Sequence, residues 1–343
     1  MNIKSTFQKY LFFLIALVLF SCKNKKNVDI SNINLDIKIE RFDQELSTLT
    51  PQSLEKKLPV LQTKYGIFYA DFMENILGVG RISDSSYYQN LRTVITDSDY
   101  NALKNEIAEK FPNMEAQEEE LTDAFKHIKY YYPKQKTPRI ITFFSGFSYQ
   151  TIIGNNYIGI GLDMFLGADS KFYPALKSSI PAYLSRRFTK ENITPRVVEA
   201  YTREELFPET DQSNSLMQRM IYNGKVLYFM DAVMPDVPDS LKIGYTTAQL
   251  EWAENFEAGV WGYFLEQNLL YETDYMKIQK YLTEAPFTPG IGEKNESAPK
   301  LAVFIGWKIV KEYMDKNREI TLQELMQEQN FQKILEKSKY RPD

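Results

Sequence analysis

One cysteine and one histidine are the only thiol and imidazole groups that this 343-residue chain offers for catalysis or metal binding. A single cysteine, Cys22, excludes an internal disulfide and a cysteine-rich zinc site. A single histidine, His127, excludes a metal site built on two imidazoles and allows at most one histidine acid or base. His127 lies beside the apolar stripe of its predicted helix, so we expect a surface or edge histidine rather than a catalyst.

The residues before Cys22 predict a modification of its thiol. Residues 11–20 form an unbroken apolar run after two lysines, which is typical of a secretory signal peptide and too short to span a membrane. The run ends in Leu19-Phe20-Ser21-Cys22, and a small residue before a cysteine resembles the lipobox of bacterial lipoproteins. We therefore predict a lipoprotein signal peptide over residues 1–21 and acylation of Cys22. The alternative is an ordinary secretory peptide that happens to carry a cysteine.

Carboxylates are the remaining candidates for acid–base chemistry. Glu257 lies within an apolar stripe of segment 247–270, which we predict to be one helix, and Glu254 lies at the edge of that stripe. Asp231 falls on the apolar side of segment 213–231. A carboxylate on a core face must be paired, hydrogen-bonded or turned toward a cleft. The simpler interpretation is an acid satisfied by a tyrosine, arginine or backbone donor, and the alternative is a ligand-binding or catalytic role.

Short motifs for other chemistries are incomplete. The chain contains no GxxxxGK[ST] phosphate-binding loop. Gly159 and Gly161 begin a dinucleotide-binding pattern, but Met164 stands where the third glycine belongs. Ser148 lacks the second glycine of a nucleophile elbow. With 41 basic and 45 acidic residues the net charge is −4, which gives no basic field for nucleic acid.

The hydrophobic pattern predicts the scaffold that must position these residues. Residues 35–42 alternate as a half-buried strand, and the β-like runs 139–145 and 157–162 are predicted to pair as a hairpin across residues 154–156. Helical spacing predicts helices over residues 54–76 (broken by Pro59 and Gly66), 99–110, 115–132, 194–206, 213–231, 247–270, 273–283 and 297–317. The fold class is therefore α+β, mostly helical with a small β-sheet.

The same pattern indicates how the chain is divided. Residues 22–35 are polar and predict a tether between the acylated cysteine and the folded part. We find no repeat or linker after this tether, so we predict one globular domain over residues 36–343. Segment 301–314 is apolar almost all round, which predicts a central buried helix. Gly224 is expected to permit the close packing of a neighbouring element.

Several phrases of the sequence are together similar to one bacterial lipoprotein family, although none of them is a chemical motif. They follow the predicted lipobox in the order NYIGIGLD (156–163), FLG (165–167), NGKVLY (223–228), IGYT (243–246) with Trp252, AP (298–299) and GWKIV (306–310). In this order they resemble the family of the gliding-motility lipoprotein GldB, over essentially the whole mature chain. The resemblance implies an envelope lipoprotein required for gliding, alongside a motility and secretion apparatus.

The family also looks distantly related to zincin-like metallopeptidases, which implies a degenerate zincin-like fold. In those enzymes a helix carries the zinc motif HExxH. The matching residues here, 198–202, contain Glu199 but neither histidine, and His127 alone cannot rebuild the site. We therefore expect no metal and no other cofactor. Glu199 joins Glu257, Glu254 and Asp231 as a candidate cleft or buried acid on a scaffold that has lost its catalytic site.

Localisation and function are expectations from the same resemblance. Residue 23 is Lys rather than Asp, and no acidic cluster follows Cys22, which favours an outer-membrane lipid anchor with the protein facing the periplasm. We expect a non-enzymatic assembly or interaction component that contacts envelope proteins of the gliding and secretion machinery and binds no nucleic acid. Two alternatives stay open, a carboxylate-dependent hydrolase and a module that binds peptide or glycan in the inherited cleft.

Overall fold

The computed structural model describes residues 28–210, 214–293 and 295–342. The chain divides into the units 1–33 and 34–343, and all helices and strands given below belong to the second unit. The predicted signal peptide over 1–21, Cys22 and the first part of the tether lie outside the described residues. None of the described helices is both long enough and apolar enough to cross a membrane.

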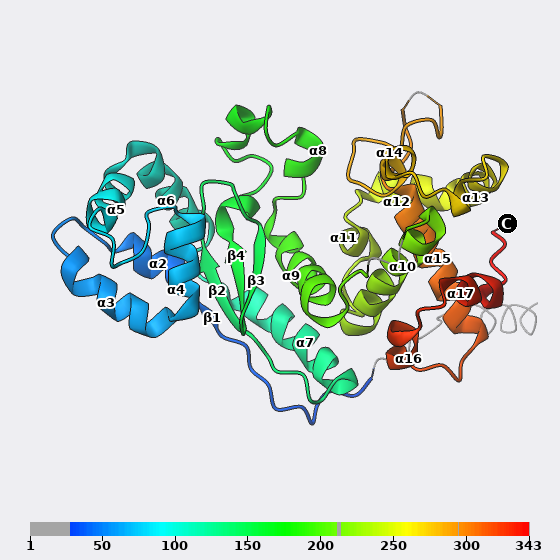
Figure 1. Ribbon diagram of the computed structural model, residues 1–343, viewed down its shortest axis with the longest axis horizontal. Helices are drawn as coiled ribbons and strands as arrows, with labels where there is room; N and C mark the ends of the chain where they lie inside the picture. Colours follow the sequence, from blue (N-terminus) through cyan, green and yellow to red (C-terminus); the bar gives the residue numbers. More distant parts are fainter. Residues whose placement is uncertain (1–27, 211–213, 294, 343) are drawn as a thin grey trace, which may run out of the picture. The chain divides into compact units, whose positions relative to one another are not determined.

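A small mixed sheet lies at the centre of the elements drawn in Figure 1. Its strands are β1 (Ile39–Glu40), β2 (Arg139–Phe143), β3 (Thr151–Gly154) and β4 (Tyr157–Gly161), in the order β1-β2-β4-β3. Strands β1, β2 and β4 run parallel, whereas β3 is the antiparallel edge strand. The turn between β3 and β4 uses Asn156 at φ 64°, a left-handed conformation that asparagine tolerates.

Two strand predictions were wrong in detail. The hairpin across residues 154–156 joins β3 to β4, whereas β2 pairs with β4 in parallel, because the unpredicted strand β3 takes the antiparallel position. The strand predicted over residues 35–42 is much shorter in the structure, where only the two residues of β1 belong to the sheet. The backbone N–H groups of Ile37 and Ile39 donate instead to the side chains of Thr122 and Glu118 on a neighbouring helix, at 2.9 Å each.

Helices α2 (Phe42–Ser47), α3 (Leu54–Tyr65), α4 (Ile67–Asp71) and α5 (Tyr87–Thr96) pack on one side of the sheet, around an aromatic core. Phe42 packs edge-on against the rings of Tyr65, Phe68 and Phe72, with centroids 4.8–5.1 Å apart. Successive side chains of β2 point to opposite faces of the sheet. Ile141 therefore faces this core, and Ile140 faces the larger one. Gly66, at φ 54°, ends α3, while Pro59 lies inside α3 without ending it.

The larger core is built on α10 (Leu216–Val233) and α15 (Leu301–Lys316). A Cβ added to Gly224 would come within 2.2 Å of the backbone oxygen of Gly306, and one added to Gly306 within 1.8 Å of the backbone oxygen of Met220. The two helices therefore cross with their backbones nearly in contact, as expected for Gly224. The central buried helix predicted over 301–314 is confirmed as α15.

The other helices surround these two cores. They are α6 (Ser98–Lys110), α7 (Glu115–Tyr131), α8 (Ala182–Ser185), α9 (Ile193–Tyr201), α11 (Asp239–Ile243), α12 (Thr247–Asn255), α13 (Glu257–Glu266), α14 (Tyr275–Ile278), α16 (Leu322–Gln327) and α17 (Phe331–Ser338), with π-helical turns at Phe72–Ile76 and Thr202–Leu206 and short 3-10 turns at Leu162–Phe165, Tyr173–Leu176, Lys190–Asn192, Leu269–Tyr271 and Gln279–Tyr281. The predicted fold class, α+β and mostly helical, is confirmed. The single helix predicted over 247–270 is wrong, because it breaks at Phe256 between α12 and α13.

Candidate functional site: a buried cationic cluster

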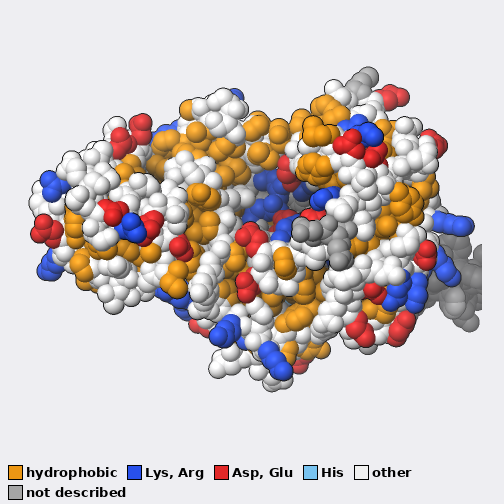
Figure 2. All heavy atoms as spheres, in the orientation of Figure 1, with side chains coloured by type: hydrophobic (Ala, Val, Ile, Leu, Met, Phe, Trp, Pro, Cys, Tyr) orange, Lys and Arg blue, Asp and Glu red, His pale blue; other side chains and the backbone are white. Residues whose placement is uncertain are grey.

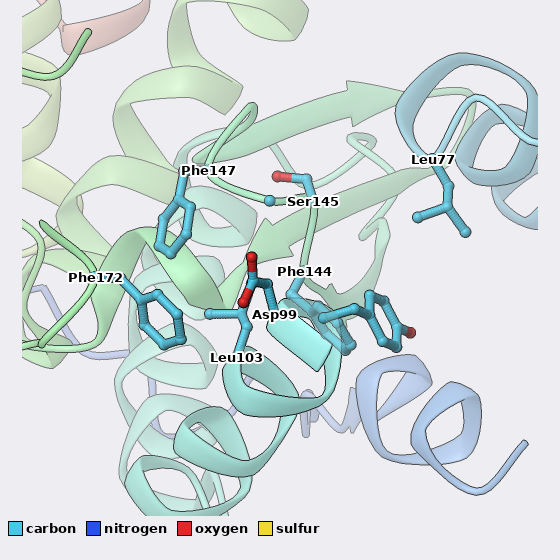
Figure 3. A pocket seen from close by; sticks show the side chains of 9 residues that line it. Leu77, Asp99, Leu103, Phe144, Ser145, Phe147 and Phe172 are labelled. Carbon is cyan, nitrogen blue, oxygen red and sulfur yellow. The ribbon is translucent and has the colours of Figure 1, made fainter. Parts of the chain in front are cut away.

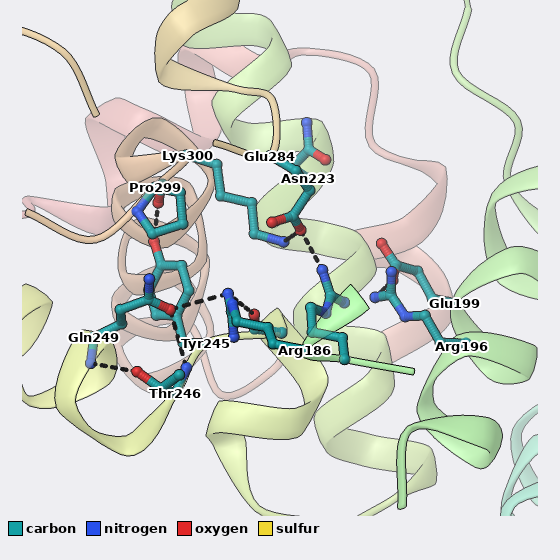
Figure 4. Close-up of polar contacts among 12 residues, drawn as sticks. Arg186, Arg196, Glu199, Asn223, Tyr245, Thr246, Gln249, Glu284, Pro299 and Lys300 are labelled. Carbon is teal, nitrogen blue, oxygen red and sulfur yellow. Dashed lines mark hydrogen bonds and ion pairs between the residues drawn. The ribbon is translucent and has the colours of Figure 1, made fainter. Parts of the chain in front are cut away.

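Glu199 on α9 lies between two arginines, one on the same helix and one in the π-helical turn that continues it. Arg196 stands one turn before it and Arg203 one turn after it, so all three side chains share a face. Arg196 donates from Nη2 to one carboxylate oxygen of Glu199, and Arg203 donates from Nε to the other at 2.9 Å. Each oxygen therefore accepts one hydrogen bond, and Figure 4 shows the one from Arg196. Among the described residues, no group of three or more His, Cys, Asp or Glu side chains could hold a metal ion.

A second acid, Glu284, is held by two further cations that reach the same place from distant parts of the chain. Arg187, which follows α8, and Lys300, which precedes α15, both pair with Oε1 of Glu284. Lys300 adopts a left-handed conformation at φ 43°. The side chains of Arg187 and Lys300 are 92% and 90% buried. Charges buried to this extent are retained only when they are paired or serve a ligand.

These residues form one site, which we call the cationic cluster: Arg186, Arg187, Arg196, Glu199, Arg203, Glu284 and Lys300. Arg186 adds a fifth cation and donates to the backbone oxygen of Gly244 at 3.2 Å and to Gln249 Oε1 at 3.1 Å. Five cations thus face two carboxylates. Figure 2 shows lysine and arginine side chains gathered in a hollow that lies, in the view of Figure 1, between α8 and α9 on one side and α11, α12 and α14 on the other.

The excess of positive charge perturbs the titration of the cluster. Burial lowers the pKa of Arg196 well below its ordinary value, and the charges of Arg187 and Arg203 lower it further. The pKa of Lys300 falls to about 7, because burial and the charges of Arg187 and Arg196 outweigh the attraction of Glu284. Burial alone would raise the pKa of Glu284, but Lys300, Arg187 and Arg196 lower it to about 2. The repulsion among the cations and the lowered pKa of Glu284 both follow from an excess of positive charge in the site.

Several donors of the cluster have no acceptor among the described residues. The unpaired donors are Nε and Nη2 of Arg187 and Nε of Arg196, and one acceptor of the cluster, Oε2 of Glu284, is also unpaired; all four atoms are buried. Such groups are rare, because a buried donor that loses water without gaining a partner costs about 1–3 kcal/mol. The guanidinium of Arg187 fits here only because residue 244 is glycine, since a Cβ at Gly244 would lie 2.1 Å from Arg187 Cζ.

Asp231 is buried in a different network. Its carboxylate accepts from Lys242 Nζ at 2.8 Å and from Trp307 Nε1 at 2.9 Å, and Lys311 Nζ lies 3.3 Å away. Asp239 also faces both lysines, at 3.3 Å from Lys242 and 3.1 Å from Lys311. Two carboxylates therefore balance two ammonium groups, and Asp231 ties α10, α11 and α15 together.

The two acids predicted around segment 247–270 separate in the structure. Glu257, at the first position of α13, accepts from the Tyr340 hydroxyl at 2.7 Å and pairs with Lys308 at 3.2 Å. This arrangement fits the simpler interpretation, a carboxylate satisfied by a tyrosine and a basic residue. Glu254 is exposed on α12, so the expectation of a buried or cleft acid is not met there. The break at Phe256 changes the helical phase on which that expectation depended.

His127 was expected at the surface or an edge, but it is buried, with 4% of its area exposed. Its Nδ1 lies 3.0 Å from the backbone oxygen of Asp123 and 3.4 Å from the carboxylate of the same residue, one turn earlier on α7. His127 is buried because α9 and α10 pack against α7 and cover more of its surface than the apolar stripe alone. His127 is not part of the cationic cluster.

A separate apolar pocket of about 460 Å³ opens where the loop after β2 meets α6 (Figure 3). The rings of Phe147 and Phe172 lie together on one side, 5.7 Å apart, and Leu77 lies on the other. Phe147, at φ 68°, is held in its left-handed conformation by Asp163, whose Oδ2 accepts from the backbone N–H groups of Ser145 and Phe147 at 2.9 and 2.7 Å. Burial raises the pKa of Asp163 to about 6, against these bonds. This pocket carries no cluster of charges.

Sequence reasoning found one member of the cationic cluster, Glu199, and missed the others. The signals were present in part. Arg196, Glu199 and Arg203 share a helix face, and Arg186 and Arg187 are adjacent. No sequence pattern, however, indicated that Glu284 and Lys300, about a hundred residues further along, would close the site.

Comparison with known proteins supports one family. The family model described as gliding motility protein GldB matches residues 23–342, nearly the whole chain. Neither the curated proteins nor the solved structures gave a match. The zincin-like relationship therefore stays a prediction. Because the family model covers the folded part of the chain from end to end, this chain belongs to the GldB family of gliding motility lipoproteins.

Proposed function

We propose that the protein is a non-enzymatic component of the gliding machinery, anchored by acylated Cys22 in the outer membrane and facing the periplasm, and that it binds an anionic group of a partner through the cationic cluster. The observation that carries this proposal is the uncompensated charge, five buried or half-buried cations against two carboxylates. An anionic group carried by another component of the motility and secretion apparatus would supply the missing charge.

The non-enzymatic part of the proposal is supported by the state of Glu199. A carboxylate that acts as a general base must lie within hydrogen-bond reach of the proton that it removes. Both oxygens of Glu199 accept from arginines, which favours a structural carboxylate that orients Arg196 and Arg203. The competing hydrolase hypothesis predicts that Glu199→Gln abolishes an activity without affecting partner binding.

The decisive experiment removes one charge of the cluster in gliding cells. We expect Arg196→Met to be made, acylated and localised normally, but to lose gliding and to lose its crosslinked envelope partners. Arg92→Met is the matched control, because Arg92 is exposed on α5. Normal gliding with unchanged crosslinks in Arg196→Met cells would refute the proposal.

The anchor is tested separately. We expect Cys22→Ala to abolish incorporation of labelled fatty acid, to leave an unprocessed or soluble form and to impair motility. Labelled fatty acid that still enters the Cys22→Ala protein would contradict the predicted lipoprotein signal.

A further inference from the structure

The anionic partner of the cationic cluster can be specified further, and this step rests on the proposed function. We infer that the cluster binds a phosphate group, carried as a phosphate monoester or as free phosphate.

The first argument is charge balance. With all five basic groups protonated, including Lys300, the cluster holds an excess of three positive charges. A single carboxylate would leave two of them uncompensated in a largely buried site. A phosphate monoester carries a charge of about −1.5 to −2 at neutral pH, so it would leave about one positive charge uncompensated. Because an uncompensated buried charge costs several kcal/mol, the more highly charged group is favoured.

The second argument is the direction of the donors. The cations come from three separate segments: Arg186 and Arg187 after α8, Arg196 on α9 with Arg203 in the π-helical turn that follows it, and Lys300 before α15. Figure 4 shows Lys300 and Arg196 on either side of Glu284, whereas Arg186 turns toward Gln249. Donors that converge from three directions suit a tetrahedral group with three free oxygens better than a planar carboxylate with two.

The third argument is the set of unsatisfied donors. The Arg187 side chain is 92% buried, yet its Nε and Nη2 have no acceptor within the described part of the chain. These two N–H groups form the edge of the guanidinium that pairs with two oxygens of a phosphate. Its third nitrogen, Nη1, is already held by Glu284, which fixes the orientation of that edge. The two carboxylates of the cluster thus position the arginines and leave part of their donors free.

The test uses the full-length acylated protein in a non-ionic detergent, with inorganic phosphate as the probe and acetate at equal ionic strength as the control. Calorimetric titration is expected to give saturable binding of phosphate and none of acetate. Arg196→Met is expected to weaken phosphate binding at least tenfold, whereas the control Arg92→Met keeps the wild-type affinity. Arg186→Met provides a second variant, because Arg186 makes no ion pair among the described residues and its loss should leave the fold intact.

Two further ligands identify the source of the phosphate. Binding of dihexanoyl phosphatidic acid, a phosphate monoester, but not of dihexanoyl phosphatidylcholine would assign a lipid-borne phosphate if it depends on Arg196. Binding of inorganic phosphate alone would assign a soluble source. Both outcomes support the inference.

The inference fails if phosphate shows no saturable binding, or if Arg186→Met and Arg196→Met bind it like the wild type. It also fails if a glutamate-rich peptide binds in an Arg196-dependent manner while phosphate does not. That last outcome would leave the proposed function standing, because the cluster would still bind an anionic partner. Unchanged gliding in Arg196→Met cells would instead refute the proposed function itself.

Discussion

The network around Asp231 and the cationic cluster both bury charged side chains against the larger core, but they differ in balance. In the first, Asp231 and Asp239 face Lys242 and Lys311, and the indole N–H of Trp307 completes the contacts at 2.9 Å. In the second, five cations share two carboxylates, and three guanidinium nitrogens lack an acceptor within the described residues. A balanced network can hold the helices together by itself. An unbalanced network needs negative charge from a ligand or a partner.

This difference has an energetic meaning. Removing one partner from a balanced buried pair leaves an uncompensated charge and costs about 3–5 kcal/mol. Removing one cation from a site that already holds too many also relieves repulsion, so the net cost is smaller. The loss of a charge from the Asp231 network should therefore cost more stability than the loss of a cation from the cationic cluster.

The largest effect is expected for Asp231→Ala. The substitution leaves Lys242, which is 1% exposed, and Lys311 facing only Asp239, and it leaves the Trp307 N–H unpaired. We expect the free energy of unfolding to fall by about 3–5 kcal/mol in denaturant titration. Asp236→Ala, at an exposed position nearby in sequence, is the control and should change it by less than about 0.5 kcal/mol. Equal effects of the two variants would show that the network is not structural.

Measuring stability as a function of pH tests the contribution of Glu284, one of the two carboxylates of the cationic cluster. The pKa of Glu284 is about 2 in the folded protein and 4.5 ordinarily, so the unfolded chain binds the proton more tightly. The ionised carboxylate therefore contributes about 3 kcal/mol of stability above pH 4.5, and this contribution is lost as the pH falls from 4.5 toward 2. We expect wild type and Glu284→Gln to differ most above pH 4.5 and to converge near pH 2. A difference that stays constant with pH would contradict the assignment.

An intermediate effect is expected at Glu257, a balanced contact with only one cation. Glu257→Ala leaves the hydroxyl of Tyr340 and the ammonium group of Lys308 without their partner. We expect a loss of about 1–3 kcal/mol in the free energy of unfolding. The exposed Glu254 is the matched control, and Glu254→Ala should melt like the wild type. A stable Glu257→Ala protein that has lost gliding would indicate a functional carboxylate instead.

The smallest effect on stability is expected for Arg196→Met. The variant loses one hydrogen bond to Glu199, which Arg203 still holds at 2.9 Å, and it gains relief from the repulsion of Arg187 and Arg203. We expect the free energy of unfolding to change by no more than about 1 kcal/mol without phosphate. A loss as large as that of Asp231→Ala would place the cluster among the structural networks and remove the contrast.

Much of the scaffold could be predicted from the sequence, because the spacing of hydrophobic residues reports the local secondary structure without knowledge of the tertiary structure. The apolar run 301–314 predicted the central helix α15, and Gly224 predicted a close helix crossing. The predictions were wrong where contacts with neighbouring elements determine the local structure. Strand β1 is shortened because side chains of α7 satisfy its backbone, and segment 247–270 breaks at Phe256 although its periodicity continues.

The sequence by itself determined the family, the mostly helical α+β class and the scarcity of thiol and imidazole groups, because these depend on residue types and local spacing. It also placed Glu199 on a helix with Arg196 and Arg203, since residues one turn apart share a face. Only the tertiary structure brought Arg187, Glu284 and Lys300 to that face, from segments up to 113 positions apart. Charge balance is a property of such a site in space, and no local pattern reports it, which is why the cationic cluster emerged only when the chain was folded.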